Sequence, residues 1–212
     1  AGGTFAITLF SDSYANNQAS TVTLDGTKIN GNNGLTVNGS NSQANVLNLT
    51  NVVANTKGVC LYLAGKGTTT VSGGSFTASE KDSAIEARAG SVTIKDGATL
   101  TSLATPFGVS ANGDGTTTTG SALAVVPHTT NYPVNVSVNG GTLSGTCAVA
   151  VANPNRSSGV CTVIVVGATL NGSVNVTKPS GDTSNPNVNI NGQQYTATAI
   201  DGPATPAPGV SR

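Results

Sequence analysis

The chain has 212 residues and a formal net charge of zero, with only nine basic and nine acidic side chains. This balance excludes a basic nucleic-acid-binding surface, and no apolar stretch approaches the roughly 18 residues of a membrane-spanning helix. The hydrophobic residues, 37% of the chain, are numerous enough to form a core, which excludes a charged disordered chain. Gly, Ser, Thr and Asn make 102 of the 212 residues, a composition that favours strands and turns over helices.

Short alternating segments recur along the chain. Residues 1–20, which hold two of the four Phe, are predicted to form an N-terminal cap or strand. Further on, apolar residues alternate with polar ones and each segment is closed by Gly or Asn, as in residues 22–26, 136–140 and 188–192. We find no window with the apolar spacing of an amphipathic helix. The chain is therefore predicted to be all-β.

Two independent markers predict an internal repeat of about 25 residues. The first is a turn glycine followed three residues later by an apolar residue, at Gly26, Gly73, Gly97, Gly140 and Gly167, with Gly192 as an incomplete copy. Its spacings are 47, 24, 43, 27 and 25, and residues 48–53 occupy the position missing from the first, double spacing. The second marker, a small residue before apolar ones, begins at residues 34, 58, 83, 121 and 146. Both markers give the same period.

This period predicts a right-handed parallel β-helix (a solenoid) of about six to seven coils, with the strand spacing giving a rod of about 30–35 Å. A β-sandwich is the main alternative, but it leaves the in-phase repetition of the same residues unexplained. Both markers stretch between residues 104 and 120, where Pro, Gly, Asp and four consecutive Thr predict an inserted loop. The predicted β-helix covers residues 21–177, and a C-terminal cap strand and Pro-rich tail cover residues 178–212.

Residues 63–101 and 121–146 resemble the β-helical repeats of secreted or wall-anchored surface proteins of Gram-positive, gut-type bacteria. Those proteins belong to the broad pectate-lyase-like β-helix group, and the resemblance covers roughly residues 20–177. It implies the fold and a secreted, extracellular or cell-surface location. It implies no defined activity, since most such repeats have none.

Three cysteines are present, so at least one is unpaired. Cys147 and Cys161 flank the turn-rich segment 152–159, which makes them a candidate disulfide. The alternative is that these two and Cys60 are small buried hydrophobic residues. The chain has no CxxC motif and no Cys/His pairing, so we expect neither a metal site nor a cofactor.

Seven charged residues gather between residues 80 and 96. Asp82 and Glu86 are candidates for the carboxylate pair of a glycosidase or the cation ligands of a lyase, with Arg88 as the base. On a strand, Glu86 and Arg88 point to the same side. The positions expected in phase with Glu86 hold no acid; they are Leu61, Ala124 and Val149. A solvated, ion-paired face is therefore the favoured interpretation, and no residue is assigned as catalytic.

His128, the only histidine, and the nearby Tyr132 are candidate binding residues. The alternative for His128 is a turn residue or a hydrogen-bonded cap, because the sequence offers no acid or nucleophile beside it. Tyrosine could stack on sugar rings, although scattered tyrosines more often pack at coil edges.

Polar residues flank the closing apolar position of each repeat. The pairs are Lys28/Asn30, Ser75/Thr77, Thr99/Thr101, Thr142/Ser144 and Thr169/Asn171. If the apolar residue points inward, these pairs point outward and stack into two parallel ranks. Several ice-binding proteins order water with such Thr-x-Thr ranks, but Thr is also simply favoured on solvated strands.

The leading hypothesis is an extracellular, non-enzymatic surface adhesin or structural rod, whose partners are other copies of itself or surface glycans and proteins. In a variant of this hypothesis, residues 1–20 or 186–200 add a strand to a neighbouring copy and form a filament. The alternative is a carbohydrate-binding or carbohydrate-active β-helix that uses residues 80–96 and the loop 104–120. Ice binding is the third hypothesis.

Overall fold

The computed structural model describes residues 4–10, 18–38, 42–113 and 115–201. Within these ranges the chain forms 22 β-strands and no helix, as the scarcity of helix formers predicts. The same ranges accordingly contain no helix long and apolar enough to cross a membrane.

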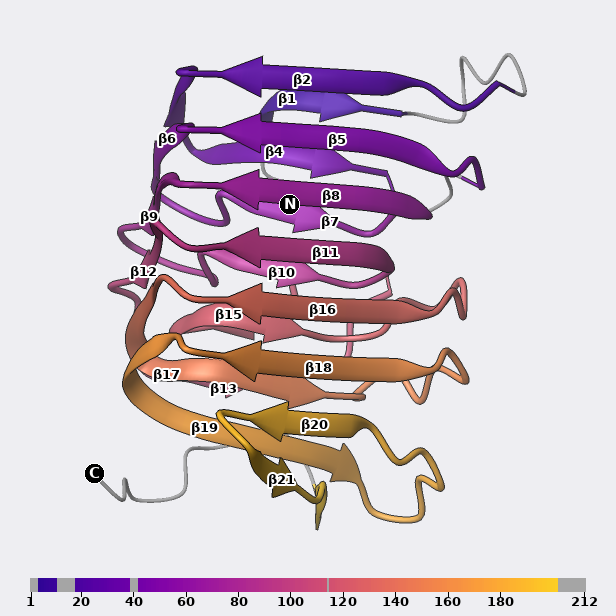
Figure 1. Cartoon of the computed structure of the whole chain (residues 1–212). Coiled ribbons are helices and arrows are strands. Elements are labelled where there is room, and N and C mark those ends of the chain that lie inside the picture. The colour runs from indigo at the N-terminus through magenta and orange to yellow at the C-terminus, as the bar shows by residue number, and fades with distance from the viewer. Residues whose placement is uncertain (1–3, 11–17, 39–41, 114, 202–212) are drawn as a thin grey trace.

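The strands form a parallel β-solenoid of about seven turns spaced about 25 residues apart, which confirms the predicted repeat (Figure 1). Each turn places one strand in each of three stacks. The first stack contains β1 (Phe5–Leu9), β4 (Asn33–Val37), β7 (Leu61–Leu63), β10 (Ile85–Ala87) and β15 (Ser121–Val125). The second contains β2 (Thr21–Asp25), β5 (Asn45–Thr50), β8 (Gly67–Ser72), β11 (Gly90–Lys95), β16 (Val134–Asn139), β18 (Cys161–Val166) and β20 (Asn187–Ile190). The third contains β3 (Lys28–Gly31), β6 (Val53–Thr56), β9 (Gly74–Ala78) and β12 (Ala98–Ser102).

Two long strands, β17 (Thr142–Ala152) and β19 (Thr169–Pro179), join the third stack to the first. The first half of β17 pairs with β12 and the second half pairs with β15. A register shift between Ser144 and Val149 marks the corner where β17 passes from one stack to the other. The third and first stacks therefore form one 12-stranded sheet.

Residues with positive φ form the corner between the second and third stacks. The predicted turn glycines all have positive φ, as at Gly97 (81°) and Gly140 (89°). In the turn where no glycine was found, Asn51 takes the same conformation with φ of 51°. Asn tolerates the left-handed region better than most residues, so the missing repeat is a substitution at the corner rather than an interruption of the solenoid.

Apolar side chains stack along the inside of the solenoid. In the third stack the inward positions are in register from turn to turn: Ile29, Ala54, Phe76, Leu100, Leu143 and Leu170. Phe76 and Leu100 are completely buried. Burial of a Phe, Leu or Ile side chain contributes about 1.5–3 kcal/mol to folding. Because the inward positions are in register, the repeated turns build one continuous core.

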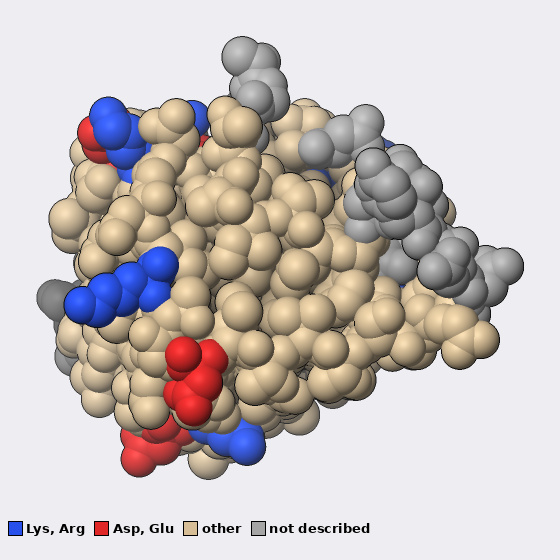
Figure 2. Space-filling model, turned by 90° about the horizontal axis from the view of Figure 1, so that it is seen from above, with Lys and Arg blue, Asp and Glu red and all other residues tan. Residues whose placement is uncertain are grey.

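The two ends of the solenoid differ. At the first turn, the apolar side chains of Ile7, Leu9, Val22 and Leu24 pack against the core but stay half-buried. Seen along the axis from this end, the face is mostly uncharged and its charged residues stand near the edge (Figure 2). At the other end, β21 (Gln193–Tyr195) folds back antiparallel on β20, and β22 (Thr198–Ile200) pairs with β19. An antiparallel last strand interrupts the parallel ladder of the second stack at this end.

Candidate functional site

The predicted inserted loop connects β12 to β15 and lies against the outer side of the first stack. It contains a short antiparallel pair, β13 (Gly108–Val109) and β14 (Thr118–Thr119). Phe107 and Val109 of the loop pack in a cluster with Val126, which directly follows β15, and with four residues of the sheet: Ala124, Cys147, Ala150 and Ala152. Three of these four sheet residues are Ala, and such small side chains leave room for the loop to approach the sheet closely.

Glu86 lies beneath this loop. On β10 it stands in register between Tyr62 and Ala124 of the neighbouring turns, and it is completely buried. Its carboxylate accepts hydrogen bonds from the backbone N–H of Thr117 (3.1 Å) and from the hydroxyls of Thr117 (2.7 Å) and Thr118 (2.9 Å). Burial raises the pKa of Glu86, and the nearby Arg88 and the threonine donors oppose this rise only in part.

Arg88 is the second completely buried charge under the loop. Its Nε lies 3.6 Å from Oε1 of Glu86. The guanidinium donates to the hydroxyl of Tyr62 (2.6 Å), to the carbonyl oxygens of Asn112 (2.8 Å) and Gly115 (2.7 Å), and more weakly to that of Val126 (3.3 Å). It also lies 5.5 Å from the centre of the Tyr62 ring, within the range of a cation–π interaction.

The prediction of a solvated ion-paired face is therefore wrong for Glu86 and Arg88. Neither side chain has any exposed surface, because the inserted loop covers both and forms hydrogen bonds with them. Asp82 lies in the bend before β10 with φ of 66° and is not part of this buried pair; burial raises the pKa of its carboxyl group. The threonine-rich end of the loop was the signal in the sequence that could have identified a partner for a buried acid.

The predicted phase of the neighbouring turns was wrong by one residue at two positions. Glu86 pairs with Tyr62 rather than Leu61, and Ala124 pairs with Ala150 rather than Val149. Leu61 and Val149 belong to the core inside the solenoid. The corrected positions still place no acid beside Glu86 in register.

His128 and Tyr132 lie in the connection between β15 and β16. His128 is buried, its backbone N–H donates to the carbonyl of Arg88 (2.9 Å), and its Nδ1 accepts from the backbone N–H of Thr130 (3.1 Å). Tyr132 is half-buried. The contacts of His128 are those of a hydrogen-bonded turn residue, and binding at either residue stays a hypothesis.

The three cysteines are free and buried, so the predicted disulfide between Cys147 and Cys161 is not formed. Cys147 belongs to the cluster beneath the loop, whereas Cys161 belongs to the core inside the solenoid. The two thiols thus pack into different clusters. Burial raises the pKa of Cys147 to about 11 and those of Cys60 and Cys161 to about 12.

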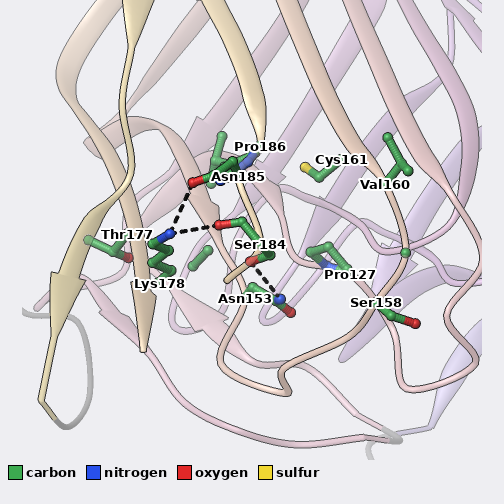
Figure 3. A pocket seen from close by; sticks show the side chains of 13 residues that line it. Pro127, Asn153, Ser158, Val160, Cys161, Thr177, Lys178, Ser184, Asn185 and Pro186 are labelled. Carbon is green, nitrogen blue, oxygen red and sulfur yellow. Dashed lines mark hydrogen bonds between the residues drawn. The ribbon is translucent and has the colours of Figure 1, made fainter. Parts of the chain in front are cut away.

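Two hollows lie in the last turns of the solenoid and share the wall made by Ala152, Asn153, Thr177 and Lys178. Figure 3 shows the smaller one, of about 170 Å³, where Lys178 Nζ donates to the carbonyl of Ser184 (2.9 Å) and to Oδ1 of Asn185 (3.0 Å). Asn153 Nδ2 donates to Ser184 Oγ (3.2 Å) and to Oδ2 of Asp182 (3.0 Å). The larger hollow, of about 340 Å³, lies between the loop and β19. The sequence pattern did not single out these residues.

The predicted polar ranks on the third stack are confirmed by the strand register. One rank contains Lys28, Val53, Ser75, Thr99, Thr142 and Thr169, and the other contains Asn30, Asn55, Thr77, Thr101, Ser144 and Asn171. The second stack carries a comparable rank that the sequence pattern did not single out: Thr23, Asn48, Thr70, Thr93, Ser137, Ile164 and Asn189. Two outer faces of the solenoid are thus lined mainly by hydroxyl and amide groups.

Comparisons with protein-family models, with curated proteins and with solved structures found no significant match. In the part of the chain that the structure describes, no three His, Cys, Asp or Glu residues lie close enough together to hold a metal ion. The function of the chain is therefore inferred from the geometry of the solenoid itself.

Proposed function

We propose that the chain is an extracellular, non-enzymatic solenoid that serves as a structural rod or adhesin at a cell surface. The observation that carries this proposal is the position of Glu86 and Arg88, which fasten the inserted loop to the first stack. They belong to the densest group of charges in the sequence, and this pair is used for folding. The carbohydrate-active alternative would need an accessible acid, which the completely buried Glu86 does not provide.

The outer faces support a role in surface contacts. Strands of the second and third stacks present mainly Thr, Ser and Asn outward, and few charged groups interrupt them. Such a rigid, nearly uncharged surface suits contacts with glycans or other proteins better than contacts that need strong charge attraction. The resemblance of residues 63–101 and 121–146 to bacterial surface β-helices agrees with this location.

The filament variant of this proposal is supported by the ends of the first stack. Within the described chain, β1 and β22 are its two outermost strands, and each pairs on one side only. Because all pairs in this stack are parallel, the free edge of β22 could pair with β1 of another copy and continue the sheet. The half-buried Ile7 and Leu9 would then become buried at the junction.

Negative-stain electron microscopy at increasing protein concentration tests the filament variant. We expect rods that lengthen with concentration, and we expect Ile7→Lys to shorten them because a charge would be buried at the junction. Thr99→Lys, on an exposed outward position of β12, is the matched control and should leave the rods unchanged. Monodisperse short particles at high concentration would exclude assembly. If the protein does not assemble, binding of the single rods to a glycan array or to cell surfaces tests the adhesin role.

Ice binding is a second candidate, and the stacked ranks on the third stack favour it. Neighbouring strands lie about 4.8 Å apart, so the hydroxyl groups of Thr99 and Thr142 repeat regularly along the rod. We would expect thermal hysteresis that Thr101→Lys abolishes, since this residue lies in the middle of a rank. Absence of thermal hysteresis in the unmodified protein would exclude this candidate.

A further inference from the structure

The larger hollow beside the loop has the features of a small-molecule site. Its volume of about 340 Å³ lies at the low end of the range of ligand pockets, about 300–1,000 Å³. Val109 and Ala111 of the loop and Ile200 of β22 supply apolar wall. Thr177, Lys178 and Arg156 supply polar groups from two successive turns. Ligand sites generally combine such an apolar wall with a few polar groups.

The hydroxyl of Thr177 is the first sign of a missing partner. Thr177 is only 6% exposed, its Oγ1 makes no hydrogen bond, and the residue lines both hollows. A buried hydroxyl without a partner is unfavourable, so buried polar atoms are usually satisfied by the protein, by water or by a ligand. This atom therefore marks a position where a ligand oxygen would be stabilised.

The charge of the hollow indicates what kind of ligand fits. Lys178 lines both hollows, and its ammonium group donates to Ser184 and Asn185, which line the smaller one. These two bonds leave one of its three N–H donors. Arg156 donates through Nη2 to the carbonyl of Ser180 (2.9 Å), and its guanidinium has further N–H groups. Among the described residues that line the hollow there is no Asp or Glu. The nearby Asp182 is occupied by Asn153 and Ser184.

We propose that this hollow binds a small organic carboxylate. The carboxylate group would accept hydrogen bonds from Thr177 and Lys178, with Arg156 adding positive charge at the opening, and the apolar part would lie on Val109, Ala111 and Ile200. This binding is independent of the structural role proposed above, since a rod or an adhesin needs no such site.

Titrations followed by NMR amide shifts test the proposal with benzoate as the probe. Benzoate should give saturable shifts at residues 156 and 177–178. Benzamide, which has the same shape without the charge, should bind at least about tenfold more weakly, the effect of one charge-assisted hydrogen bond. Inorganic phosphate should also bind more weakly because it leaves the apolar wall unused, and benzylamine should not bind. Absence of saturable benzoate shifts, or equal binding of benzoate and benzamide or phosphate, would overturn the proposal.

Two variants separate binding from folding. Thr177→Val should weaken benzoate binding about tenfold without lowering the unfolding midpoint, because the hydroxyl has no partner to lose in the free protein. Lys178→Met should weaken benzoate binding as well. Lys95→Met, on the exposed outer side of β11, is the matched control and should leave binding unchanged. If Thr177→Val lowers stability and leaves benzoate affinity unchanged, the hydroxyl is structural and the proposed site is wrong.

Discussion

Glu86 on β10 and Arg88, the residue directly after β10, stand two residues apart, and each holds a different part of the same loop. Arg88 binds the carbonyl oxygens of Asn112 and Gly115, whereas Glu86 binds the backbone and hydroxyl groups of Thr117 and Thr118 in the returning limb. The Nε–Oε1 distance of 3.6 Å joins the two charges beneath the loop. One buried ion pair thereby fixes a segment whose described residues contain a single short antiparallel pair, β13 and β14.

Breaking this pair from one side should strongly destabilise the fold. Arg88→Met leaves the Glu86 carboxylate buried without its cation, and such changes cost about 3–5 kcal/mol. The double variant Glu86→Leu/Arg88→Met should lose less than the sum of the two single variants, because no buried charge is left unpaired. Urea unfolding of the four proteins measures this coupling.

The exposed ion pair between Lys57 and Glu80 is the control for that cycle. Its N–O distance is shorter, 3.1 Å, but its side chains are 57% and 59% exposed. Lys57→Met should therefore change the unfolding free energy by less than about 1 kcal/mol. Equal losses of unfolding free energy in Lys57→Met and Arg88→Met would show that burial of the charge is not the cause of the destabilisation. Additive losses from Glu86→Leu and Arg88→Met in the double variant would show the same.

The apolar anchor of the loop gives a second prediction. Phe107 is 2% exposed and packs against Ala124 and Val126, so Phe107→Ala should weaken the attachment of the loop by up to about 3–5 kcal/mol. We expect faster cleavage between residues 108 and 116 in limited proteolysis. Leu103→Ala, at a 61% exposed position of the same loop, should leave the cleavage rate unchanged. Equal rates for both variants would contradict the anchoring role.

The buried thiols predict a loss of stability in alkali. The pKa values of about 11–12 lie above the ordinary value of 9.0, so each thiol stabilises the folded state below pH 9 and loses this contribution as the pH rises towards 11–12. At pH 10 the loss should reach about 1 kcal/mol per thiol. The free energy of unfolding of Cys161→Ala should decrease less between pH 8 and 10 than that of the unmodified protein. An identical decrease in both would contradict this account.

The same burial predicts that the three thiols are unreactive in the folded protein. Cys60, Cys147 and Cys161 are free, so a thiol reagent should modify none of them under native conditions and all three after unfolding. Modification of only one thiol after unfolding without reductant would reveal a disulfide.

The repeat could be predicted because it is written in local residue types. A glycine at each corner and an apolar residue three positions later follow from positive φ and from the alternation of a strand, and Asn51 shows how the pattern tolerates a replacement. The partners of Glu86 could not be predicted, because Thr117 and Thr118 reach it through a loop 31 and 32 residues away in the chain. The hollow lined by Asn153 and Lys178 likewise exists only where two successive turns lie side by side.

Gly26 and Gly74 separate the two reasons for which this fold needs glycine. Both have positive φ, 56° and 86°, so alanine at either position should lose about 1–2 kcal/mol through backbone strain. A Cβ at Gly26 would meet open space, whereas a Cβ at Gly74 would overlap the backbone carbonyl oxygen of Val52 on the preceding turn. Gly74→Ala must therefore push β9 away from β6, and we expect a further loss of about 1–3 kcal/mol. Thermal unfolding of the two variants measures the difference, and equal midpoints would show that close approach of successive turns does not require glycine at this corner.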